Sequence, residues 1–277
     1  MRSFKIIASD LDGTLLNSRS EISEKNLAAI EEINRRGVHF VPCTGRAFTE
    51  IPEIIRKNSN IRYIIYSNGA ALIDTKSNTK ILNGIPKDTA KHIFDTLARY
   101  ETYLTIRHGG NCYVDLAKKN DKANVHYNLC LPHINVVDNF ALAREDFEEW
   151  MHTLDDIEVV SAFFHSDEEC LACRKALSEM EELFVASSAD YNLEIFNKKA
   201  GKGSALCKLA DMLGVKNEET AAVGDSENDI SMIRAAGYGF AVANASDELK
   251  AICDATVVSN DDDAINDILL NYVIRNG

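Results

Sequence analysis

A short apolar segment that ends in two carboxylates constrains this chain more than any other stretch. Residues 6–8 have the length and β-branched content of a buried strand, and Asp10 and Asp12 follow directly. Because side chains two positions apart on a strand point the same way, both acids would be aimed at one point beyond its end. Ligands of open α/β sheets bind there, so the stretch predicts a polar site; the alternative is an ordinary acidic turn.

Three further segments repeat this pattern of an apolar strand followed by small or polar residues: 38–42, 63–66 and 220–223. Helical periodicity separates them, and each ends in hydroxyl, amide, carboxylate or glycine residues. Strands that alternate with helices indicate parallel βαβ units. We therefore predict an α/β fold built on a doubly wound, mostly parallel sheet.

The middle of the chain has a different pattern. It contains alternating segments at 102–106 and 112–116, a helix around 142–152, a strand at 158–164 and a helix at 167–180. Pairs of strands joined by turns suggest an α+β module with an antiparallel sheet, and nothing here repeats the strand-then-acid pattern. The predicted organisation is a core of residues 1–83 and 191–277, with an inserted α+β cap domain at 84–190.

The charge balance limits the classes of partner. The 277 residues carry a formal net charge of −13, so nucleic acid and anionic membrane surfaces would be repelled. An anionic small substrate would need a local positive group, such as a metal ion or lysine. The N-terminal residues include no apolar signal region, and no stretch approaches the roughly twenty apolar residues of a spanning helix, which predicts a cytoplasmic protein.

The seven cysteines are scattered and odd in number, as expected for reduced thiols in a cytosolic protein. Cys170 and Cys173 form a CxxC pattern, but they lie in a predicted helix with no second Cys or His pair nearby. Between a zinc or redox site and an incidental pair of helical cysteines, we favour the incidental pair.

The strand ends and one basic loop together supply six chemical groups: Asp10, Asp12, Thr44, Lys202, Asp225 and Asp229. Four carboxylates converging on one crevice would repel one another unless a cation lay among them. Magnesium suits such a site because it takes hard oxygen ligands and completes its shell with water and phosphate. The hydroxyl of Thr44 and the ammonium of Lys202 would then hold phosphoryl oxygens, which outlines a phosphoryl-transfer site.

Four motifs span the chain in order: Asp10-Leu-Asp-Gly-Thr-Leu, Thr44-Gly-Arg, Lys202-Gly and Gly224-Asp-Ser-Glu-Asn-Asp. They resemble the ordered motifs of the haloacid dehalogenase-like hydrolase superfamily. The insertion between the second and third motifs resembles the cap of its Cof-type (type IIB) branch. The resemblance implies a Rossmann-like core and a magnesium-dependent phosphatase of sugar phosphates or other small phosphorylated metabolites.

The resemblance also implies roles for individual residues. Asp10 would be the nucleophile that forms an aspartyl-phosphate, and Asp12 would protonate the leaving alkoxide and then activate water. Thr44 and Lys202 would bind the phosphoryl group and offset its charge. Without the other motifs, a helix N-cap would be the favoured explanation of Thr44.

Metal and substrate contacts follow from the same resemblance. Magnesium would be bound by the Asp10 and Asp225 carboxylates and the Asp12 backbone carbonyl, with Asp229 a ligand or immediately behind one. The alternative for Asp229 is a salt bridge that only orients Lys202. Three further residues are assigned to substrate binding: Gly45, Arg46 and Asn228. Gly45 and Arg46 are also explained as parts of a turn.

In the cap, four side chains are candidates for contacting the leaving group, although a structural role is favoured for each: Arg107, His108, Tyr113 and His126. Two other functions remain open at this stage. One is a phosphotransferase or phosphomutase, in which another hydroxyl replaces water. The other is a phospho-accepting receiver, which also gathers acids, a hydroxyl and a lysine at strand ends but needs no inserted domain.

Overall fold

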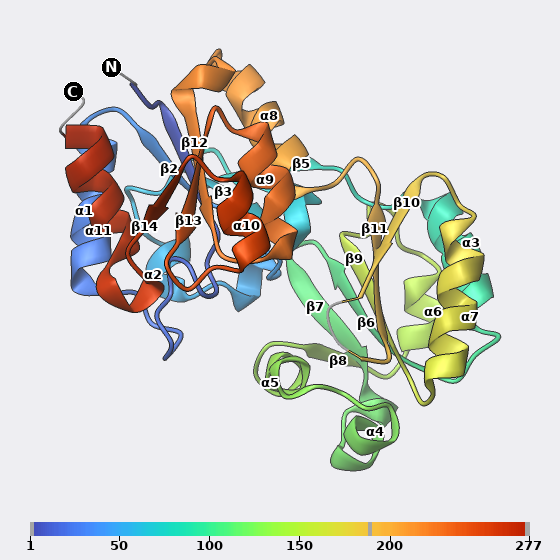
Figure 1. Cartoon of the computed structure of the whole chain (residues 1–277). Coiled ribbons are helices and arrows are strands. Elements are labelled where there is room, and N and C mark those ends of the chain that lie inside the picture. The colour runs from blue at the N-terminus through green and yellow to red at the C-terminus, as the bar shows by residue number, and fades with distance from the viewer. Residues whose placement is uncertain (1–2, 188–189, 275–277) are drawn as a thin grey trace. The chain divides into compact units, whose positions relative to one another are not determined.

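The computed structural model describes residues 3–187 and 190–274, and the chain forms two compact units (Figure 1). The first unit comprises Met1–Gly45, Pro52–Ile81 and Gly201–Gly277, and the second comprises Arg46–Ile51 and Leu82–Ala200. Residues 191–200 therefore belong with the second unit and not with the core to which the sequence analysis assigned them. The reason is that their strand pairs with the sheet of the second unit.

Five parallel strands form the main sheet of the first unit: β1 (Ile6–Ser9), β2 (His39–Pro42), β12 (Thr220–Gly224), β13 (Tyr238–Val242) and β14 (Ala255–Val257). They are hydrogen-bonded in the order β14-β13-β12-β1-β2, so that Ile6 of β1 lies opposite both Thr220 and His39. Their residues are almost all buried, as expected for a parallel sheet covered on both faces. The predicted doubly wound, mostly parallel sheet is confirmed.

Helices cover both faces of this sheet (Figure 1). On one face α1 (Glu24–Arg35) packs against α11 (Ala264–Ile268), and the other face carries α8 (Lys202–Leu213), α9 (Ile230–Ala235) and α10 (Asp247–Ile252). Two further helical segments belong to this unit, α2 (Glu53–Arg56) and the C-terminal turns at Leu269–Ile274. Helix α1 begins after Ser23, whose hydroxyl caps it by accepting a hydrogen bond from the Asn26 amide.

The third predicted strand differs from the parallel βαβ pattern. Strand β3 (Tyr63–Tyr66) pairs antiparallel with β4 (Ala71–Asp74), and β5 (Thr79–Leu82) completes a separate three-stranded sheet. The chain turns back because three successive residues have left-handed φ angles: Ser67 (50°), Asn68 (54°) and Gly69 (84°). One isolated parallel bridge, between Cys43 and Ile65, joins β3 to the chain that follows β2.

A six-stranded sheet forms the second unit, in the order β10-β11-β9-β6-β7-β8. Its strands are β6 (Thr102–His108), β7 (Asn111–Asp115), β8 (Leu142–Arg144), β9 (Val159–Phe164), β10 (Leu183–Ala186) and β11 (Asn192–Asn197). All neighbours are antiparallel except β7 and β8, which confirms the predicted α+β character. The helix predicted around 142–152 is wrong in its first part, since residues 142–144 form an edge strand.

Alternating side chains on these strands form two cores, one on each face of the sheet. Leu104 and Ile106 pack with α3 (Lys87–Leu97), α6 (Phe147–Met151) and α7 (Asp167–Ser178). Tyr103 and Phe163 point to the other face and pack with residues of α4 (Asp121–His126) and α5 (Leu131–Asn139) (Figure 1). Neither α4 nor α5 was predicted from the sequence.

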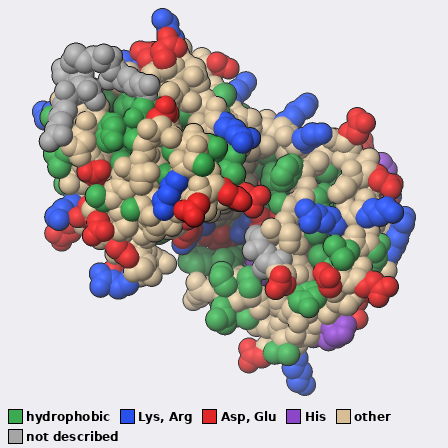
Figure 2. Space-filling view, viewed as in Figure 1, with side chains coloured by type: hydrophobic (Ala, Val, Ile, Leu, Met, Phe, Trp, Pro, Cys, Tyr) green, Lys and Arg blue, Asp and Glu red, His purple; other side chains and the backbone are tan. Residues whose placement is uncertain are grey.

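The cysteines of the CxxC pattern lie on α7, and both are buried in the core formed with α3 and α6. All seven cysteines are free thiols. None of the described helices is long and apolar enough to cross a membrane. On the face drawn in Figure 2, acidic side chains are scattered over both units, with basic side chains between them.

Candidate active site

The candidate site begins where β1 and β12 end side by side. The Asp10 amide donates a hydrogen bond to the carbonyl of Val223 (3.0 Å), so the pairing of the two strands continues as far as Asp10. Three carboxylates converge here: Asp10 after β1, Asp225 after β12, and Asp229 in the helical turn that follows Asp225. Each offers an oxygen within 4.8 Å of the others. Four of the predicted site residues, these three and Lys202, are thus brought together within the first unit.

Lys202 lies at the first turn of α8, and its side chain is only 1% exposed. Its ammonium group donates to Asp10 Oδ1 (2.6 Å) and to Asp229 Oδ1 (2.7 Å). Burial opposes the charge of this ammonium group, but the carboxylates of Asp10 and Asp229 outweigh burial and raise the pKa of Lys202 above its ordinary value. The lysine is therefore held as a cation between two acids.

Asp229 has both carboxylate oxygens engaged by the protein. While Oδ1 accepts from Lys202, Oδ2 accepts from the backbone amides of Asp225 (3.0 Å) and Ser226 (3.2 Å). The residue is completely buried. These contacts favour the second of the two interpretations left open by the sequence, in which Asp229 orients Lys202 and the loop that carries Asp225.

Two residues of the first motif, Gly13 and Thr14, contact the carboxylate of Asp225. The Thr14 hydroxyl donates to Asp225 Oδ1 (2.9 Å), and Gly13 approaches the same carboxylate so closely that a Cβ atom would lie 2.7 Å from Oδ2. Gly13 also has a left-handed φ of 77°. The first motif therefore needs glycine at this position for two reasons, the backbone conformation and the space for Asp225.

This close approach leads to a prediction for Gly13→Ala. The new methyl group would displace the Asp225 carboxylate and would strain the backbone, so we expect activity to fall by about 10²-fold, the effect of misplacing a catalytic group by about 1 Å. Steady-state kinetics beside a thermal unfolding curve would measure both effects. Gly37→Ala is the matched control, since Gly37 also has a positive φ (76°) but no atom within 4 Å of its Cβ position. Equal losses of activity in the two variants would contradict the close-contact explanation.

The electrostatics of the site favour a bound cation. Burial is the largest of the effects that together raise the pKa of Asp10 to about 8; Lys202 opposes this rise, and Asp229 and Asp225 contribute to it. Burial also raises the pKa of Asp225, and the nearby carboxylates of Asp229 and Asp12 add to this effect. The site therefore contains one ammonium group, that of Lys202, and at least three carboxyl groups, so its acids outnumber its cations. The donors are all hard oxygens, so the residues present fit magnesium.

The hydroxyl-bearing second motif is fixed by the strand that follows it. The Thr44 amide donates to the carbonyl of Ile65 (3.0 Å), and the Thr44 carbonyl accepts from the Asn68 amide (3.0 Å). A Cβ atom on Gly45 would lie 2.9 Å from Asn68 Oδ1, so Asn68 packs directly on this motif. Sequence reasoning missed Asn68 as part of the site, although the Ser67-Asn68-Gly69 loop after β3 was the available signal.

The remaining predicted site residues have less defined surroundings. Asp12 is exposed and forms a backbone bridge with Leu16, and Asn228 is exposed and accepts a hydrogen bond from the Ser226 hydroxyl (2.8 Å). Arg46 belongs to the second unit, where its guanidinium donates to the carbonyl of Glu50 (2.9 Å). The roles assigned to these residues stay predictions.

The four side chains proposed to contact the leaving group all lie in the second unit and have partners there. Arg107 pairs with Glu50, and the rings of Tyr113 and His108 pack against Trp150. His126 forms an ion pair with Glu101 when protonated and stacks on His165. A substrate contact for any of the four therefore stays a prediction.

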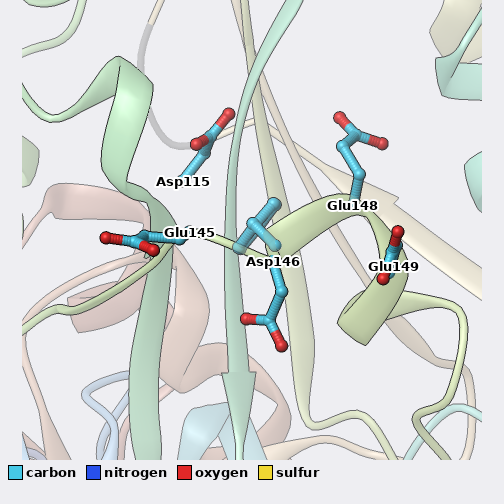
Figure 3. Close-up of a pocket in the computed structure, with 6 residues that line it drawn as sticks. Asp115, Glu145, Asp146, Glu148 and Glu149 are labelled. Carbon is cyan, nitrogen blue, oxygen red and sulfur yellow. The ribbon is translucent and has the colours of Figure 1, made fainter.

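The second unit also has a pocket of 410 Å³ whose lining is acidic (Figure 3). Its lining residues are Asp115, Glu145, Asp146, Phe147, Glu148 and Glu149. A phosphate ester would be repelled by these carboxylates. We therefore place the candidate site at the strand ends of the first unit and not in this pocket.

Comparison with known proteins agrees with the site chemistry. Residues 7–269 match the haloacid dehalogenase-like hydrolase family. Phosphatase YwpJ of Bacillus subtilis is 32% identical, over 94% of this chain and 97% of its own. The 5-amino-6-(5-phospho-D-ribitylamino)uracil phosphatase YwtE of the same organism is 30% identical, over 94% of this chain and 95% of its own. The solved structure of a haloacid dehalogenase-like hydrolase from B. subtilis superimposes with a TM-score of 0.79 at 31% identity, covering 97% of this chain and 100% of that one.

The four motifs, the sheet that carries them and these similarities lead to one conclusion. The longer segment of the second unit, Leu82–Ala200, is inserted between the motif of Thr44 and the motif of Lys202. The chain belongs to the haloacid dehalogenase-like hydrolase family.

Proposed function

We propose that this protein is a magnesium-dependent phosphatase that hydrolyses small phosphomonoesters through an aspartyl-phosphate intermediate. The observation that carries the proposal is the contact of Lys202 Nζ with both Asp10 and Asp229, beside the carboxylate of Asp225. A lysine held at this point can exchange a carboxylate partner for a phosphoryl oxygen. The proposal is also supported by the phosphatase names of relatives that match over nearly the whole chain.

In the first step, an oxygen of Asp10 bonds to phosphorus while the bond between phosphorus and the leaving oxygen breaks. Asp12 gives its proton to that leaving oxygen, which departs as an alcohol. In the second step, water attacks the aspartyl-phosphate, and its proton passes to the Asp12 carboxylate. Inorganic phosphate leaves and Asp10 is restored. Lys202 and the Thr44 hydroxyl bind the phosphoryl oxygens throughout.

Asp10, Asp225 and the backbone carbonyl of Asp12 would hold the magnesium ion. When bound, it supplies positive charge that offsets the carboxylates and the phosphoryl oxygens. The excess of acids over cations among the buried side chains supports this part of the proposal. Asp229 then has the separate task of holding Lys202 in place.

Metal dependence gives the first test. We expect phosphate release to require magnesium and to fall to background with chelator, because the site would otherwise repel an anionic substrate. The panel should contain sugar phosphates, flavin mononucleotide, pyridoxal phosphate and 5-amino-6-(5-phospho-D-ribitylamino)uracil, the compound named for one relative. Full activity in chelator would contradict the metal assignment.

Hydrolysis and phosphotransfer are separated by the product. In ¹⁸O-labelled water, hydrolysis puts one labelled oxygen into each phosphate released, whereas transfer to a second alcohol puts none. The phosphatase proposal predicts labelled phosphate. We also propose a cytoplasmic location, in agreement with the seven free thiols.

A further inference from the structure

The backbone passes between the two units four times, although an inserted domain requires only two passages. The passages lie between residues 45 and 46, 51 and 52, 81 and 82, and 200 and 201. The first pair encloses Arg46–Ile51, which we call the strap. The strap directly follows Thr44 and Gly45 of the first unit in sequence, but by its contacts it belongs to the second unit.

One end of the β6–β7 hairpin holds the middle of the strap. Both the amide and the hydroxyl of Thr49 donate to the carbonyl of Gly110, at 3.0 and 3.2 Å. Gly110 lies in the turn between β6 and β7, and its own amide donates to the buried Glu158 carboxylate (2.7 Å). The hairpin turn is thus itself anchored to the start of β9, and the strap is anchored to the turn.

A buried ion pair fixes the strap more firmly. The Glu50 side chain is 2% exposed and the Arg107 side chain 12%, and two bonds of 3.3 Å join them, Nε to Oε1 and Nη2 to Oε2. Glu50 Oε2 also accepts from the Ala47 amide (3.0 Å), and the Glu50 carbonyl accepts from the Arg46 guanidinium (2.9 Å). One glutamate therefore organises the strap from Arg46 onward and joins it to β6.

A charged pair is a costly way to hold a six-residue loop. Two ions must be desolvated, so buried pairs are weak evidence for stability and are better explained by the single arrangement that they specify. Here the arrangement specified is that of the backbone that leaves Gly45. The first residue of that backbone is Arg46, whose guanidinium donates to the Glu50 carbonyl, so the ion pair also fixes where the Arg46 side chain lies within the second unit.

We propose that Glu50 and Arg107 are positioning residues of the phosphatase site. Their ion pair seats the strap on the β6–β7 hairpin and so fixes Arg46, the first residue of the strap, for its role in binding the substrate. This inference rests on the predicted role of Arg46 in substrate binding and on the proposed phosphatase function.

The test compares two charge-neutral double variants. Glu50→Gln with Arg107→Met removes the strap pair without leaving one charge buried alone. Asp74→Asn with Arg62→Met is the matched control, because it removes an ion pair of the first unit that lies outside the site (2.8 Å). The readouts are kcat and KM on the best substrate of the panel, the Kd of inorganic phosphate with magnesium by calorimetry, and the melting temperature.

We expect the strap variant to lose about 10- to 100-fold in kcat, as misplaced binding groups do. The Kd of phosphate should rise at least about threefold, because the loop is no longer preorganised. The control should keep both values within about twofold of wild type, as expected for a partly exposed pair. A folded strap variant with wild-type kcat and phosphate affinity would overturn the proposal.

A milder variant, Thr49→Val, covers the case in which the double variant does not fold. It removes the hydroxyl contact with Gly110, and we expect kcat to fall about threefold through the same loss of preorganisation. If kcat and the Kd of phosphate were both unchanged in this variant, the proposed positioning role of the strap would be contradicted. A wild-type protein that binds phosphate without turnover would refute the proposed function, while the affinities of the variants would still decide the role of the strap.

Discussion

Asp10→Asn will abolish turnover without unfolding the protein. Asparagine keeps the shape of the side chain but is a far weaker nucleophile, and loss of a covalent nucleophile costs roughly 10⁴- to 10⁶-fold in kcat. The pKa of Asp10, which burial and the neighbouring acids raise to about 8, shows that its charge is unfavourable in the metal-free protein. A neutral amide should therefore leave the melting temperature of the metal-free protein unchanged or slightly higher.

Kinetics, the melting temperature and intact mass would be measured on the same preparations. Wild-type protein quenched during turnover should carry one phosphoryl group, and the variant none. Asp88→Asn is a control at an exposed aspartate in the first turn of α3, where we expect no change. If Asp10→Asn kept more than about a tenth of the wild-type kcat, Asp10 would not be the nucleophile, because a lost nucleophile costs far more than tenfold.

Lys202→Met should damage both stability and activity. Removing the ammonium group leaves Asp10 and Asp229 buried without their shared partner, a change that typically costs about 3–5 kcal/mol. Loss of a preorganised cation at the phosphoryl group should lower kcat/KM by about 10²- to 10³-fold. Magnesium should restore part of the stability, because a bound cation offsets the same excess of negative charge.

A second substitution separates the two effects. The double variant Lys202→Met with Asp229→Asn should recover much of the lost free energy of unfolding, since one unpaired acid is removed, but it should not recover kcat/KM. Lys208→Met, an exposed lysine on the same helix, controls for the helix itself. Denaturant unfolding and steady-state kinetics provide the measurements. A loss of less than about 1 kcal/mol for Lys202→Met, the range of exposed pairs, would mean that the lysine is not paired as described.

Much of the fold could be predicted because its signals are local. A parallel strand covered on both faces is a short apolar run, so β1, β2 and β12 could be predicted from short stretches of sequence. The polar residues that follow such strands also marked where a site would lie. Strands β8 and β10 were missed because short strands at the edge of a sheet carry little periodicity, and helices α4 and α5 were missed because they have only six and nine residues.

The sequence by itself determined the chemical groups of this protein, the order of its four motifs and the α/β class of its sheet. Tertiary structure alone decided how those groups are arranged. Lys202 lies between Asp10, 192 positions away, and Asp229 because β1 and β12 pair in the sheet. The packing of Asn68 against Gly45 and the seating of the strap on the β6–β7 hairpin have the same origin. Periodicity describes one element at a time, whereas these contacts depend on strand order and on buried charges that pair across the fold.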